Sequence, residues 1–185
     1  MNSVKLYSGI SRCAWGYFFL YFDINIGAVS ILPRFVGYWL FLTALGLLAE
    51  EERELKLLRP LCIGLLLWQV LCWGLPILGI EPSGRVAFAD VVVCVTELYF
   101  QFQLLTNLAT IAQRCQPEDG GYDRKILSCR TMQTVLLTAG MVSEKLAFLF
   151  GDFWGYLSLG MAVPYLFAGI YILATLFSLR KSVVV

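Results

Sequence analysis

Long apolar runs separated by short polar breaks dominate this chain and predict about six helices. Several of these runs approach the ~20 residues that an α-helix needs to cross ~30 Å of hydrocarbon. Pro33 marks the start of the second run, because proline is favoured at the first position of a helix. The pattern predicts an all-α integral membrane protein, a bundle of about six helices in a single membrane domain over 1–185. The expected helices cover about 4–22, 33–58, 60–79, 86–113, 126–150 and 153–179.

Polar and apolar residues alternate between the first two runs, over residues 23–32, with Gly27-Ala28 at the centre. A two-residue loop that begins with glycine is typical of a type II′ hairpin turn. A bilayer interior admits non-helical backbone only where protein or water satisfies its amides, so we expect a short β-hairpin-like segment at the membrane surface. The alternative is a first helix that continues through residue 31 and buries Asp23. The hairpin would pair Ile26 with Val29, Asn25 with Ser30 and Ile24 with Ile31.

Composition supports the membrane class and excludes several kinds of chemistry. Of the 185 residues, 59% are hydrophobic and 15% are charged, whereas soluble domains carry about 25% charged residues. The chain has no histidine, the commonest zinc ligand and a frequent catalytic base, and its 6 cysteines form no Cys-x-x-Cys pair. We therefore expect no enzyme, no metal and no cofactor, although catalysis by carboxylates alone stays open. The net charge of +1 gives no reason to expect a nucleic-acid partner.

Lysine and arginine residues predict how the helices are oriented. If segments 50–59 and 114–130 and both termini lie on one side, that side holds all of the 14 basic residues except Arg34, Arg85 and Lys145. Cytoplasmic loops carry the excess of positive charge, so we expect a multi-pass protein with both termini in the cytoplasm. The first apolar run is short for a crossing. Either the basic residue before it snorkels to the surface, or the first helix is only half-inserted.

Ionisable residues inside a membrane are expensive and are candidates for function. In this topology Asp90 lies about 6 Å into the fourth helix, and Glu144 and Lys145 lie about 8 Å into the fifth, all from the outer end. Asp23 and Arg34 occupy an outer connection at a similar level. This outward-facing charged layer is either a polar pocket or a set of ion pairs that joins the helix ends.

Glu97 differs from the other charges because it lies about 17 Å from the outer end of the fourth helix, near the middle of the membrane. Gln101 follows one turn later on the same face. Glu97 and Gln101 either line a water path, with the carboxylate binding a proton or cation, or form a pair in which a protonated Glu97 is hydrogen-bonded in the core.

The N-terminal part of the chain also carries a resemblance. It reads Phe22-Asp23-Ile24-Asn25-Ile26-Gly27 and then Ile31-Leu32-Pro33-x-Phe35-Val36-Gly37-Tyr38. These residues, under a tenth of the chain, resemble the N-terminal signature of an uncharacterised family of small polytopic membrane proteins of Gram-positive bacteria. Members often have an acidic residue where this chain has Arg34. The resemblance implies a bacterial cytoplasmic (inner) membrane and supplies no activity.

These observations favour a non-enzymatic inner-membrane protein. We expect it to bind a small solute, a lipid or a membrane partner, including a second copy of itself, through the outward-facing charged layer. The alternative is a small secondary transporter or channel in which Glu97 is the proton- or cation-coupling carboxylate.

Overall fold

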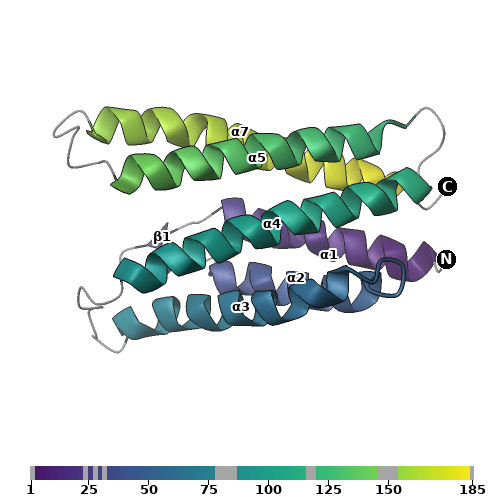
Figure 1. The fold of residues 1–185 in the computed structure, drawn as a ribbon, viewed down its shortest axis with the longest axis horizontal. Helices are drawn as coiled ribbons and strands as arrows, with labels where there is room; N and C mark the ends of the chain where they lie inside the picture. Colours follow the sequence, from purple (N-terminus) through teal and green to yellow (C-terminus); the bar gives the residue numbers. More distant parts are fainter. Residues whose placement is uncertain are drawn as a thin grey trace.

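The computed structural model describes residues 3–22, 25–26, 29–30, 33–77, 87–115, 120–145 and 154–183. Within these residues the chain forms six helices, so the all-α bundle is confirmed. Figure 1 shows them as long, roughly antiparallel rods, with the beginning of the first and the end of the last at the same end of the bundle. They are α1 (Ser3–Tyr21), α2 (Arg34–Leu48), α3 (Leu55–Ile77), α4 (Ala87–Cys115), α5 (Tyr122–Lys145) and α7 (Trp154–Ser182).

The six helices form a closed ring. Each helix packs against the next in the chain order, and α7 packs back against α1. At the terminal end, Arg180 closes the ring by donating a hydrogen bond to the Ser11 hydroxyl at 3.1 Å, and its guanidinium stacks over the ring of Tyr7. A ring of six helices has an interior that several helices share, and that interior holds the site described below.

Glycines allow α1 to approach its two neighbours closely. A methyl group at Gly37 of α2 would lie 2.9 Å from the carbonyl oxygen of Gly16 on α1. A methyl group at Gly16 would meet the Phe41 ring at 2.6 Å, and one at Gly169 of α7 would meet Tyr21 at 2.5 Å. Small residues at helix contacts are the usual means by which membrane helices pack closely.

The prediction that the second helix runs to residue 58 is wrong, because α2 ends at Leu48 and α3 begins at Leu55. The turn between them holds four glutamates, at positions 50, 51, 52 and 54. Negative charge is unfavourable at a helix C-terminus, and like charges four residues apart repel each other along a helix. Pro60, which was expected to start the third helix, lies in the second turn of α3 instead, where only the carbonyl of exposed Lys56 loses its amide partner.

Long-range ion pairs also hold this acidic turn. The Lys5 ammonium of α1 lies 2.7 Å from the Glu50 carboxylate. Arg114, at the end of α4, lies 2.9 Å from the Glu52 carboxylate and donates a hydrogen bond to the Glu51 carbonyl at 3.2 Å. The turn therefore links α1, α2, α3 and α4 at one end of the bundle.

Two strands of two residues each, β1 (Asn25–Ile26) and β2 (Val29–Ser30), lie between α1 and α2. They pair antiparallel, with Asn25 opposite Ser30 and Ile26 opposite Val29. The predicted turn at Gly27-Ala28 and the outer pair at 24 and 31 lie outside the described residues. The longer hairpin-like segment over 23–32 therefore stays a prediction.

Three of the described helices are long and apolar enough to cross a membrane: Leu55–Leu75, Ala89–Cys115 and Gly160–Ser182. Their outer surfaces carry exposed large apolar side chains, which a soluble protein would bury. This set includes Leu57, Leu67 and Leu71 on α3, Val91, Val92 and Val95 on α4, and Val163, Phe167 and Ile170 on α7. These features are compatible with a membrane protein. α2 is apolar but shorter, at 15 residues, and α5 begins at Tyr122 rather than near 126.

Candidate functional site

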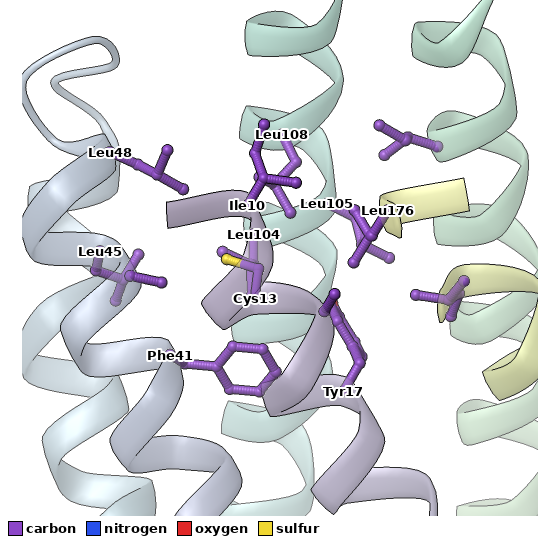
Figure 2. Close-up of a cluster of buried hydrophobic side chains, with 14 of the residues drawn as sticks. Ile10, Cys13, Tyr17, Phe41, Leu45, Leu48, Leu104, Leu105, Leu108 and Leu176 are labelled. Carbon is purple, nitrogen blue, oxygen red and sulfur yellow. The ribbon is translucent and has the colours of Figure 1, made fainter. Parts of the chain in front are cut away.

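Apolar side chains from α1, α2, α4 and α7 fill the ring interior toward the end where α1 begins (Figure 2). The Tyr17 and Phe41 rings lie 5.0 Å apart, and Phe41 lies 5.8 Å from Phe100 across the interior. We call this layer the apolar floor. Its residues include Ile10, Cys13, Tyr17, Phe41, Leu45, Leu48, Leu104, Leu105, Leu108 and Leu176.

Beyond the apolar floor, toward the opposite end, the interior becomes polar. Gln101, next to Phe100 on α4, is almost fully buried and donates a hydrogen bond to the Glu97 carboxylate at 3.0 Å. Gln133 of α5 is also buried, as are the Tyr38 and Tyr21 side chains. The helical spacing of four residues accounts for the contact between Glu97 and Gln101, because such positions lie one above the other on a helix.

A pocket of about 320 Å³ opens at this polar level, and we call it the inner pocket. Its charged residues are Arg34, from the first turn of α2, and Glu97, from the middle of α4. α2 is not a neighbour of α5 or α7 in the ring, so a pocket lined by all three lies across the interior. The remaining lining residues are Cys94, Leu136, Leu137, Gly140, Met141, Met161, Ala162 and Tyr165.

Two tyrosines connect the opposite charges of the inner pocket. Tyr165 lines the pocket together with both charges, and Tyr38 lies one turn after Arg34 on α2, with its hydroxyl against Glu97. The Tyr165 ring packs against the Tyr21 ring with centroids 4.6 Å apart, which fixes its position against α1. The pocket therefore presents a carboxylate, a guanidinium and phenol groups at one level, where they can bind polar groups of either charge.

The buried side-chain oxygen of Gln101 has no hydrogen-bond partner in the described part of the chain. The Tyr38 hydroxyl lies against Glu97, and the Gln133 amide lies against the Tyr21 hydroxyl. Buried polar groups are nearly always hydrogen-bonded in native proteins, and water or a polar ligand often supplies the partner. The Gln101 oxygen can therefore accept a hydrogen bond from water or from a polar ligand.

Two features shape the apolar wall of the inner pocket. The Ser143 hydroxyl of α5 lies 2.9 Å from the Gly140 carbonyl, to which it donates, and 3.3 Å from the Met161 sulfur of α7. The contact with Met161 joins the two helices beside the pocket. Pro164, inside α7, has no amide hydrogen and therefore cannot bond the carbonyl at 160, which interrupts the backbone ladder beside Tyr165.

The structure brings together three of the residues that the sequence singled out, Arg34, Glu97 and Gln101. Asp90 does not line the inner pocket, and its side chain is exposed in the first turn of α4. Glu144 and Lys145 belong to the last turn of α5, but their side chains lie outside the described part of the structure, as does Asp23 entirely. The complete charged layer therefore stays a prediction.

Sequence reasoning missed Tyr38, Tyr165 and Gln133. For Tyr38 a signal was present, because it lies four residues after Arg34 and so shares its face of the helix. Tyr165 follows Pro164 in a helix, and a proline at membrane depth often marks a site. Nothing in the local pattern distinguishes Gln133 from a residue on the outer surface of the bundle.

Comparison with known proteins gives no further guide, because no family model, curated protein or solved structure matches this chain.

Proposed function

We propose that this chain is a multi-pass membrane protein, with both termini in the cytoplasm, that binds a small amphipathic solute in the inner pocket without chemical conversion. The observation that supports this proposal most directly is the lining of the inner pocket, which combines the charged Arg34 and Glu97 with leucine and methionine side chains. The volume of about 320 Å³ is at the lower end of the ~300–1,000 Å³ typical of ligand pockets. The resemblance of the N-terminal signature favours a bacterial cytoplasmic membrane.

Local hydrogen bonds support a membrane location for α5, which is the most polar of the described helices. The hydroxyls of Thr131 and Thr134 donate to the carbonyls of residues 127 and 130, one turn before each, at 3.0 and 2.8 Å. Arg130 donates to the Thr106 hydroxyl at 3.1 Å and stacks over the Phe102 ring. The two threonine hydroxyls and the Arg130 Nη1 atom therefore have partners within the protein, as the bilayer interior requires.

The chemistry of the inner pocket defines the class of solute. A polar or charged head group would contact Arg34, Glu97 and the Tyr165 hydroxyl, and an apolar part would contact Met141 and Met161. Methionine side chains are flexible and polarizable, so they adapt to apolar groups of different shape. Amino acids with apolar side chains, short-chain acids and small amines all have this composition.

Binding can be tested with the full chain purified in detergent, by measuring the melting temperature against a panel of these three solute classes. The blocking variant is Gly140→Leu, because Gly140 lines the inner pocket and no atom lies within 4 Å of a methyl group placed there. Gly64→Leu is the matched control, since Gly64 has the same open surroundings and is exposed on α3, outside the pocket. We expect at least one solute to raise the melting temperature of the wild type and of Gly64→Leu but not of Gly140→Leu.

If no solute in the panel distinguishes Gly140→Leu from Gly64→Leu, the binding proposal is wrong. For a solute that does bind, the Glu97→Gln variant tests whether the charge of the solute matters for binding. Loss of a cationic solute with retention of an anionic one would indicate that the carboxylate contacts the head group.

The second candidate is a small secondary transporter or channel that uses Glu97 as its coupling site. Its specific support is that buried polar residues continue beyond Glu97, with Gln101 about 6 Å and Asn107 about 15 Å further along α4. Transport requires the apolar floor to open, because Leu104 and Leu108 fill the interior at that level. It predicts a flux in reconstituted vesicles that depends on pH or on a cation gradient and is lost in Glu97→Gln. A flux that Glu97→Gln leaves unchanged would exclude this role.

A further inference from the structure

A second pocket lies between α5 and α7, at the level of Leu176 in the apolar floor. It has a volume of about 240 Å³, and it is lined by Tyr122, Lys125, Tyr171, Ala174, Thr175 and Ser178. The side chains of Ala174 and Ser178 are small and lie four residues apart, so they leave a groove on one face of α7. We call this pocket the α5–α7 groove, and it is separate from the inner pocket.

One positive charge stands at the α5–α7 groove. Lys125 is exposed, and its ammonium lies 5.2 Å from the centre of the Tyr122 ring. This distance allows a cation–π contact, which holds the ammonium near the groove while leaving its hydrogens available to an acceptor. The Thr175 hydroxyl lines the groove and donates to the Tyr171 carbonyl at 2.8 Å. The exposed Ser178 side chain also lines the groove. The lining therefore suits an anionic group that accepts hydrogen bonds.

An apolar stripe leads away from the groove along α7. Val163, Phe167 and Tyr171 are exposed and follow one another at intervals of four residues, and Ala174 continues the same face. From Ala174 to Val163 the stripe is about 16 Å long at 1.5 Å per residue. This length matches one leaflet, which is about 15 Å or half of a ~30 Å hydrocarbon core. An acyl chain that starts at the groove would therefore lie along the stripe to the middle of the membrane.

We propose that the α5–α7 groove binds an anionic phospholipid, with the phosphate of the head group at Lys125 and one acyl chain along the stripe from Tyr171 to Val163. The groove lies near the start of α5 and the end of α7, at the end of the bundle where α1 begins (Figure 1). Basic residues collect in that part of the sequence, which predicts the cytoplasmic level where anionic lipid head groups attract Lys and Arg. The proposal does not depend on the inner pocket or on any solute that binds there.

The test measures binding of phosphatidylglycerol and phosphatidylcholine to the full chain in detergent by native mass spectrometry. Lys125→Gln removes the charge, and Arg124→Gln is its matched control, because Arg124 is the adjacent exposed base and does not line the groove. Ala174→Leu fills the groove without changing charge, and Ala139→Leu is its control at an exposed site of α5 outside the groove. Melting temperatures without lipid check that all four variants are folded.

We expect Lys125→Gln to weaken phosphatidylglycerol binding about fivefold, the effect of one basic residue near an anionic surface. Ala174→Leu should weaken it as well, and both control variants should bind as the wild type does. Equal losses in Lys125→Gln and Arg124→Gln would contradict the proposal, because they would indicate diffuse surface charge. Wild-type binding that does not prefer phosphatidylglycerol over phosphatidylcholine would also contradict it. Displacement of the lipid by millimolar glycerol phosphate would assign the groove to a soluble phosphate and overturn the lipid assignment.

Discussion

Substitution of Gly37 by alanine tests the close contact between α1 and α2 on which the ring depends. The new methyl group would lie 2.9 Å from the Gly16 carbonyl oxygen, and it would also meet the Phe19 Cβ at 3.3 Å. A backbone carbonyl cannot move aside as a flexible side chain can, so the two helices must separate. Overpacking of this kind costs about 1–3 kcal/mol of folding free energy.

Gly64→Ala is the matched control, because Gly64 is also inside a helix and has no atom within 4 Å of the added methyl group. Both substitutions gain about 1 kcal/mol from the higher helix propensity of alanine. The propensity terms cancel in the difference between the two variants, which leaves the steric cost. Gly37→Ala should therefore be about 1–3 kcal/mol less stable than Gly64→Ala, a difference in melting temperature of about 2–12 °C at this chain length.

The assay is thermal unfolding in one detergent, followed by circular dichroism, with both variants measured beside the wild type. Gly37 lies one turn after Arg34 on α2, so a displaced α2 should also weaken any solute binding that depends on the Arg34 side chain. If Gly37→Ala melts at the same temperature as Gly64→Ala or above it, then α1 and α2 are not in the close contact described here.

Two further predictions concern polar contacts, and unfolding by denaturant in detergent measures both. Arg114→Ala should lower the free energy of unfolding by about 1–2 kcal/mol, because its partner Glu52 is only 14% exposed. Lys5→Ala should lower it by about 0–1 kcal/mol, because both members of its ion pair are well exposed, and equal losses would contradict the role of Arg114 in fixing the acidic turn. Thr131→Val should change stability by less than about 0.5 kcal/mol, since its hydroxyl is exposed and bonds only the carbonyl at 127, and a larger loss would indicate a contact between helices.

The apolar runs predicted six helices because helix formation in such sequences is a local property of length and composition. The predicted second helix continued past the break between α2 and α3, because the residues at the break favour a helix by local composition. Glutamate, arginine and lysine are good helix formers, so residues 50–58 looked like a continuation of the second helix. The ion pairs of the turn with Lys5 and Arg114 join distant parts of the chain, so the local sequence gives no sign of them.

The candidate site divides in the same way between local and long-range features. Glu97 and Gln101 are one helical turn apart, so their contact follows from spacing alone. Tyr165 reaches the same pocket only because α7 packs back against α1 and closes the ring. Asp90 was expected at the charged level because depth along a helix can be counted from the sequence. Depth does not reveal packing, however, and the first turns of α4 turn out to be largely exposed.

The reactivity of Cys94 in membrane vesicles tests most directly whether the inner pocket is open to water on the outer side. Cys94 lines the pocket about 10 Å from the start of α4, and Cys72 is exposed on the outside of α3 about 8 Å from its end, so the two lie at similar depth. Each thiol is measured in a chain whose other cysteines are replaced by alanine, with a charged, membrane-impermeant thiol reagent added to one side at a time. We predict that Cys94 reacts from the outer side only, because the apolar floor blocks the cytoplasmic side, and that Cys72 reacts from neither. Equal protection of Cys94 and Cys72, or modification of Cys94 from the cytoplasmic side alone, would contradict an outward-facing pocket around Glu97 and Arg34.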